Sequence, residues 1–286
     1  MLKLLKVDLK RVFKDKLFLV MGILALAFAV AIPLLYVVLF SSLGLNTDEM
    51  SMTLEALGMS INAKSMFFQS MFFQSFSLGN NLGLILPVLL AIILCKDFSH
   101  GTVRNKIISG KSRTSIFMSM YTVCFSVLFG VMVLHALLTM LVSLIFFPYQ
   151  STEFVASDIG YFLLSLLFEA LLYAFVSALV SFLCACTKNM GLAIVGYVAI
   201  VMIMSVVTSM LQVGALMMPV ADDGYSAIQK GLEFLQDVNP FNFAAVIGVG
   251  TEYSAREVLC CILSPAILSA GITLLGIFKF KKKDIK

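Results

Sequence analysis

The sequence contains six long stretches with at most one charged residue, and each is long enough to cross a lipid bilayer. A helix needs about 20 apolar residues to cross the hydrocarbon core. Five stretches carry no charge and one carries only Glu169; they are 17–47, 65–95, 114–152, 159–187, 189–221 and 258–278. Membrane β-strands would instead show weak alternation over about 10 residues. The sequence therefore predicts an all-α integral membrane protein.

The composition leaves no room for a soluble catalytic domain. The 286 residues are 60% hydrophobic and only 13% charged, whereas soluble domains have about 25% charged residues. We therefore expect a single transmembrane domain over residues 1–286. The six spans are placed at about 17–40, 78–95, 115–147, 159–186, 190–213 and 258–278.

The distribution of Lys and Arg predicts the orientation in the membrane. With these spans, one side receives six in 1–16, five in 96–113, Lys188 and five in 279–286, while the other side receives three. Cytoplasmic segments carry the excess of Lys and Arg. We therefore predict a multi-pass protein of the cytoplasmic membrane with both termini in the cytoplasm. The basic residues indicate topology and not a nucleic-acid partner.

The first 16 residues have an amphipathic pattern. Leu2, Leu5, Leu9 and Phe13 recur at helical spacing, and lysines occupy another face. Such a helix lies in the membrane interface with its lysines toward anionic lipid headgroups. The alternative is a simple basic flank of the first span.

Two predicted external segments are too long to be turns. In the first, Phe68, Phe72 and Phe76 recur every four residues. We interpret them as an aromatic helical lead-in to the second span, either an interfacial belt or a surface that meets substrate. In the second, 219–257, we expect two short helices on the outer face, because the apolar run 241–249 is too short to span the bilayer.

The sequence lacks the residue patterns of common enzymes. It has two histidines and no His-Glu-x-x-His motif. Gly110-Lys111-Ser112 resembles the end of a phosphate-binding loop, but position 105 is Asn where that loop needs Gly. The six cysteines lie within or at the ends of the spans, so we expect neither a disulfide framework nor a metal site. We predict that the chain is not an enzyme.

The connection between the second and third spans predicts a short cytoplasmic helix. Val103 and Ile107 form a candidate apolar patch, and Gly110 suits the left-handed position after a helix. A short amphipathic helix of this kind fits a groove on a partner protein. The alternative is an ordinary basic loop.

This connection resembles the signature of the ABC type-2 export permeases. The matching residues are Asp97, Gly101-Thr102, Arg104 and Ser112-Arg113. The family more often has Glu at the position of Asp97. The order of an amphipathic N-terminal segment, six spans, external helices before the last span and a basic tail is also similar to that family. Among its members, the small permeases that export phenol-soluble modulins, bacitracin or lantibiotics look most similar.

The resemblance implies a partner and a mechanism. Two permease copies, or this chain and a paralogue, would assemble with two ATPase subunits that bind ATP and Mg, and this chain would hold no cofactor. The docking helix would present Asp97, Gly101, Thr102, Val103, Arg104, Lys106, Ile107 and Arg113. The cargo would be amphipathic peptides, and the source bacterial. The alternatives are ABC export of a drug, lipid, glycan or ion, or a secondary transporter or membrane scaffold without an ATPase.

One pair of ionisable residues lies deep inside the predicted bilayer. His135 precedes the end of the third span by 12 residues, and Glu169 follows the start of the fourth by 10. At 1.5 Å per residue these offsets correspond to ~18 Å and ~15 Å, so the two have similar depth. Such residues face the protein interior and find partners. We expect either a mutual hydrogen bond or separate partners such as Tyr173 or a serine, or a role for Glu169 in attracting cationic cargo.

Overall fold

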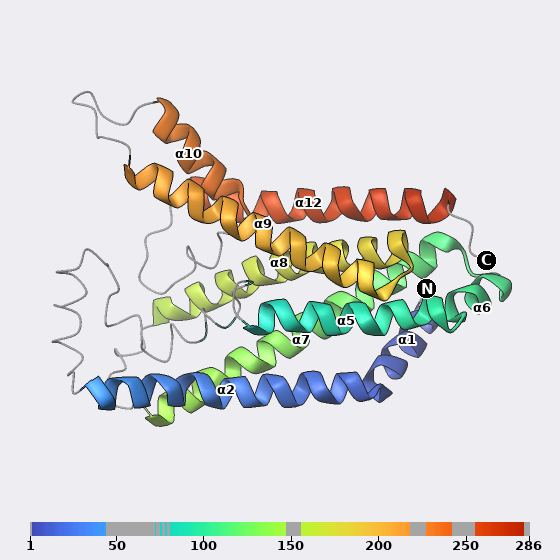
Figure 1. The fold of residues 1–286 in the computed structure, drawn as a ribbon, viewed down its shortest axis with the longest axis horizontal. Coiled ribbons are helices and arrows are strands. Elements are labelled where there is room, and N and C mark those ends of the chain that lie inside the picture. The colour runs from blue at the N-terminus through green and yellow to red at the C-terminus, as the bar shows by residue number, and fades with distance from the viewer. Residues whose placement is uncertain are drawn as a thin grey trace.

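The computed structural model describes residues 2–43, 72, 75, 78, 81–146, 156–217, 227–241 and 255–282. Within these residues the chain forms helices and no strand. The elements are α1 (Leu2–Lys14), α2 (Lys16–Leu43), α5 (Asn81–Ser99), α6 (Thr102–Ile108), α7 (Arg113–Phe146), α8 (Ala156–Thr187), α9 (Met190–Met217), α10 (Ala227–Val238) and α12 (Ala255–Lys282). Figure 1 shows the long helices side by side in an elongated bundle.

Six of these helices are long and apolar enough to cross a membrane, which confirms the predicted fold class. They are α2, α5, α7, α8, α9 and α12. Each predicted span falls on one of them, and every end agrees within four residues. The largest differences are at the ends of the second, fifth and sixth spans, where the helices end at Ser99, Met217 and Lys282. Those differences add about one helical turn at each of the three ends and leave the topology unchanged.

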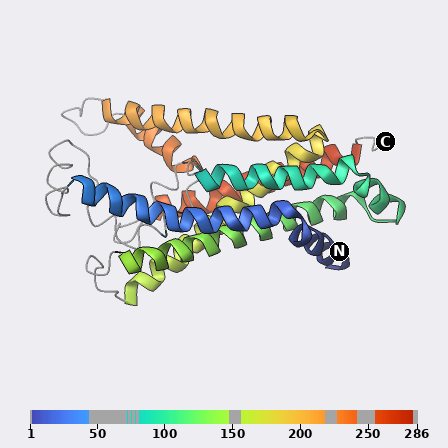
Figure 2. The same cartoon turned by 60° about the horizontal axis from the view of Figure 1, so that its bottom comes forward.

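Helix α8 occupies the centre of the bundle. It packs against α12, α7, α5 and α9, while α2 packs mainly on α7. Helix α2 lies along one edge of the bundle in Figure 1, and α9 lies along an edge in the rotated view of Figure 2. Their outer faces expose large apolar side chains such as Leu19 and Ile23 on α2 and Val195 and Met202 on α9. These faces suit contact with lipid chains.

The contact between α7 and α12 depends on a glycine. A Cβ atom on Gly276 would lie 2.3 Å from Cζ of Phe117, and Phe117 is fully buried. We expect Gly276→Ala to lower the free energy of unfolding by about 1–3 kcal/mol, the usual cost of overpacking a core. Gly271→Ala is the matched control, because a Cβ there meets nothing within 4 Å. Thermal unfolding of both variants in detergent checks this; equal stabilities would contradict it.

Helix α10 turns back toward the spanning helices. The carbonyl of its last residue, Val238, accepts a hydrogen bond from the Ser264 hydroxyl. The side-chain amide of Asn239 donates a hydrogen bond to Thr208 Oγ1 at 2.6 Å. Asp237 pairs with Arg256 at 2.9 Å. One of the two short helices expected before the last span is therefore present, and its C-terminal end is held between α9 and α12. The segment 242–254 lies outside the described residues.

Helix α1, helix α6 and the C-terminal end of α12 lie at the same end of the bundle, as the N and C labels in Figure 1 show. We call this the basic end, because α1, α6 and the last turn of α12 carry ten of the 17 basic residues that the structure describes. Both described chain ends therefore lie on one side of the spanning helices, as the even number of spans requires.

Candidate functional site

Helices α1 and α2 meet at Asp15, which holds their junction. Its Oδ1 accepts a hydrogen bond from the Leu17 amide at 3.0 Å, as in an N-cap, and its Oδ2 lies 3.1 Å from the Lys96 ammonium. Burial alone would raise the pKa of Asp15, but the hydrogen bonds from Leu17 and Lys96 outweigh it and lower the pKa. The carboxylate is therefore charged at neutral pH and connects the α1–α2 junction to α5.

Helix α6 is short because both of its ends are terminated by glycines. Gly101 precedes it with a left-handed φ of 68°. Gly110 follows it with a φ of 80°. The Gly110 amide donates to the Ile107 carbonyl at 2.9 Å and the Lys111 amide to the Lys106 carbonyl at 3.1 Å, which is a Schellman motif. The predicted left-handed role of Gly110 is confirmed.

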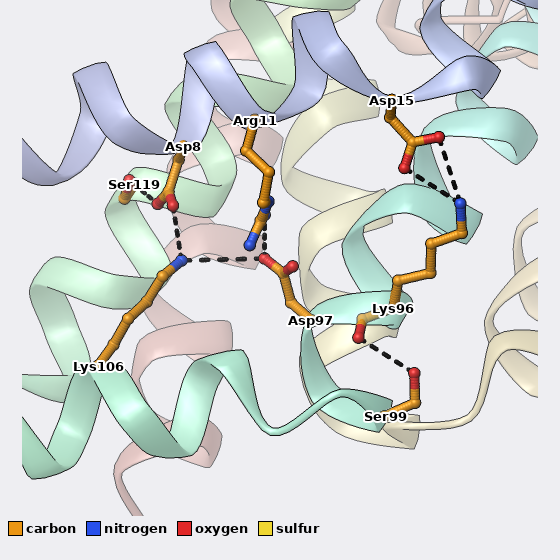
Figure 3. A network of polar contacts seen from close by, with 8 residues as sticks. All are labelled: Asp8, Arg11, Asp15, Lys96, Asp97, Ser99, Lys106 and Ser119. Atoms are coloured by element: carbon orange, nitrogen blue, oxygen red, sulfur yellow. Dashed lines mark hydrogen bonds and ion pairs between the residues drawn. The ribbon is translucent and has the colours of Figure 1, made fainter.

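Four charged side chains from three helices form a cluster between α1, α5 and α6 (Figure 3). Asp8 and Arg11 come from α1, Asp97 from α5 and Lys106 from α6. The Lys106 ammonium lies 2.8 Å from Asp8 Oδ1 and 3.8 Å from Asp97 Oδ2. The Arg11 guanidinium donates to Asp97. We call Asp8, Arg11, Asp97 and Lys106 the charged cluster.

Three of the four side chains in the charged cluster are largely removed from water. The side chains of Asp8 and Asp97 are 5% exposed and that of Lys106 is 10% exposed. Asp8 also accepts a hydrogen bond from the Ser119 hydroxyl of α7 at 2.7 Å. Two cations face two carboxylates, so the cluster is electrically neutral. Buried charges persist only when they are paired in this way, and the pairing ties α6 to α1, α5 and α7.

The structure corrects the predicted surface of α6. Val103 is fully buried, and Ile107 packs against the core, so they do not form an exposed patch. Lys106 points inward to the charged cluster. The outward residues are Arg104, Asn105 and Ile108, and Ile108 is 73% exposed. The apolar stripe was correctly recognised, but it faces the protein's own helices.

The remaining residues of the family-like motif lie around the same end of the bundle. Thr102 begins α6. Ser112 caps α7, because its hydroxyl oxygen accepts a hydrogen bond from the backbone amide of Ser115 at 3.2 Å. The Arg113 guanidinium donates to the Lys281 carbonyl at 2.7 Å, where the unsatisfied carbonyls at the C-terminus of α12 favour a cation. The motif therefore joins α5, α6, α7 and α12 into one unit.

His135 and Glu169 are both buried, but they have separate surroundings. His135 Nδ1 lies 2.9 Å from the Ala25 carbonyl of α2. Because a carbonyl only accepts, Nδ1 carries the proton. Glu169 is 1% exposed and lies near Tyr173 and near Cys261 of α12. Among the described residues, its Oε2 atom has no hydrogen-bond partner. The mutual pair is therefore not formed, and each residue meets a different helix.

Of the three predicted aromatic residues, the structure describes one. Phe72 is buried and packs edge-on against Phe162 of α8 at 5.0 Å between ring centroids. Phe68 and Phe76 lie outside the described residues. Within the described ranges, His, Cys, Asp and Glu form no group that could hold a metal ion.

The charged cluster contains two residues that sequence reasoning missed, Asp8 and Arg11. A signal was present, because Asp8 and Asp15 are the only acidic residues among the first 16, and Arg11 lies on the same helical face as both. Acidic residues that point away from the lysine face of such a helix indicate a local partner for a cation.

Comparison with known proteins adds no family to this description. We find no family model and no curated protein that matches the chain. The family resemblance therefore rests on the motif between α5 and α7 and on the order of the helices.

Proposed function

We propose that this chain is the membrane-spanning permease subunit of an ATP-driven ABC exporter of amphipathic peptides. The observation that carries the proposal is helix α6. It projects from the basic end, it is closed by glycines at both ends, and buried ion pairs fix it to α1 and α5. An exposed helix held this firmly can transmit a displacement caused by a partner protein to the helix bundle.

The partner in this proposal is an ATPase subunit in the cytoplasm, which binds the outward face of α6. That face presents Arg104, Asn105 and Ile108. Ile108 offers an exposed apolar anchor, and Arg104 offers a charge at its side. A central apolar anchor with a polar rim is the usual composition of an interface hot spot. ATP hydrolysis belongs to the partner, and a second permease copy completes the conduit.

The outward face of α6 provides the direct test. We expect Ile108→Asp combined with Arg104→Glu to abolish peptide export and release the ATPase from the purified complex. Both side chains are solvent-exposed, so the folded chain should keep its stability within about 0.5 kcal/mol. Export of labelled peptides, copurified ATPase activity and thermal unfolding are measured on the same full-length protein.

Two controls make this test specific. Ile108→Val keeps the apolar contact, and Lys10→Glu reverses an exposed charge on α1 at the same end of the bundle; both should leave export unchanged. Normal export by the double variant would overturn the docking proposal. A complex with one permease copy for two ATPases would overturn the permease pair.

A further inference from the structure

Three buried cysteines meet where α5, α7 and α8 pack together. Cys95 of α5 is 2% exposed, and Cys124 of α7 and Cys184 of α8 are fully buried. All three carry free thiols. Neither the proposed transport cycle nor the charged cluster uses them, so their proximity calls for a separate explanation.

Cys95 and Cys184 lie beside each other where α5 packs on α8. The Cys184 Sγ atom lies 3.7 Å from the Ala91 carbonyl, and Ala91 is one turn before Cys95 on α5. The two thiols are close enough to influence each other electrostatically. Both lie near the basic end, four residues before the end of α5 at Ser99 and three before the end of α8 at Thr187.

The sequence suggests different pairs, which the helices separate. Cys184 and Cys186 are two residues apart, so on a helix they point about 200° from each other. Cys260 and Cys261 are adjacent on α12 and therefore about 100° apart. Cys186 and Cys260 are also partly exposed, whereas their neighbours are buried. Only packing of two distant helices brings Cys95 and Cys184 together.

We propose that Cys95 and Cys184 form a redox-active dithiol, which a small membrane-soluble quinone oxidises to a disulfide that links α5 to α8. Two S–H bonds break and one S–S bond forms. The two electrons and two protons pass to the quinone, which becomes a hydroquinone. An apolar oxidant is required because the thiols are shielded from water by the packed helices.

The location of the dithiol gives the disulfide a consequence. Cys95 directly precedes Lys96 and Asp97, which connect α5 to the α1–α2 junction and to the charged cluster. A covalent link to α8 would hold this end of α5 in place. Oxidation would thereby restrict movement of the unit that contains α6.

The test uses the full-length protein in membrane vesicles exposed to duroquinone. Free thiols are then blocked with N-ethylmaleimide, and the protein is digested and analysed by mass spectrometry. We expect a peptide pair joined through Cys95 and Cys184, two fewer blocked thiols, and reversal by dithiothreitol. Cys184→Ser should abolish the cross-link, while Cys186→Ser, on the same helix, should leave it intact.

A second reagent tests the wild-type chain without any substitution. Phenylarsine oxide bridges two neighbouring thiols and releases one water, so it should protect Cys95 and Cys184 together from later oxidation. The proposal is overturned if duroquinone leaves both thiols free while it oxidises dithiothreitol in the same vesicles. It is also overturned if the recovered cross-link joins other cysteines.

Discussion

Lys106→Met should lower the free energy of unfolding by about 3–5 kcal/mol, the range for removing one partner of a buried ion pair. Met keeps most of the side-chain volume, so the loss is electrostatic. It leaves Asp8 and Asp97 buried with Arg11 as the remaining cation of the charged cluster. Denaturation of the purified protein in mixed detergent micelles measures the change.

A second substitution should restore much of this loss. Asp8→Asn combined with Lys106→Met leaves Arg11 and Asp97 as a neutral pair, and the Asn oxygen can still accept the Ser119 hydroxyl. We expect the double variant to be more stable than Lys106→Met alone. Lys10→Met, at an exposed position on α1, should change stability by less than about 0.5 kcal/mol. Additive losses in the double variant would show that the charges act independently.

The spans could be predicted because a bilayer imposes one strong requirement on each helix. A run such as 189–221 must be apolar throughout to cross hydrocarbon, and this is visible without knowing its neighbours. The structure accordingly has α9 over Met190–Met217. Turn chemistry is equally local, which is why the role of Gly110 was predicted correctly.

The direction that α6 faces could not be predicted in the same way. Val103 and Ile107 were recognised as an apolar stripe, but a stripe fits equally a partner's groove or the protein's own core. The choice depends on α1, which is about 90 residues away in sequence and supplies Asp8 for Lys106. Charge pairing across that separation depends on tertiary structure, so it cannot be predicted from the residue pattern within 96–113.

For His135 and Glu169, the sequence likewise predicts depth in the membrane but not rotation about the helix axis. Rise per residue gives depth, and both residues are indeed buried. Rotation about each helix axis depends on which neighbours pack where. His135 faces α2, whose Ala25 carbonyl it contacts, and Glu169 lies near Cys261 of α12. Two residues at one depth on adjacent helices can therefore lack any mutual contact.

The contacts at the basic end indicate how a displacement of α6 would be transmitted to the spanning helices in the proposed exporter. Lys106 connects α6 to α1 and α5, Asp15 connects the α1–α2 junction to Lys96, and Arg113 connects α7 to the end of α12. Because these links are ionic or charge-assisted, they are short and directional. Movement of α6 would therefore reach four spanning helices through a few side chains.

Glu169→Met should raise the free energy of unfolding, by about 1–3 kcal/mol. A buried polar atom without a partner costs about that amount, and Glu169 Oε2 has no hydrogen-bond partner among the described residues. Met fills a similar volume with apolar atoms. Glu169→Gln should stay close to wild type, because the amide keeps the shape and one oxygen. Thermal unfolding of both variants in the same detergent measures this, and a loss of stability in Glu169→Met would show that the carboxyl has a stabilising partner.

Export by these variants then tells whether the carboxyl serves transport. Ionisable groups at this depth are expensive and are usually functional, so we expect both variants to lose export of cationic peptides while neutral peptides are still exported. A charge-assisted hydrogen bond is worth about 1.5–3 kcal/mol, which corresponds to a roughly tenfold to hundredfold loss in apparent affinity. Gain of stability together with loss of export would separate this role from helix packing, because a packing residue would affect both in the same direction. Unchanged export of cationic peptides by Glu169→Met would exclude the carboxyl from the cargo path.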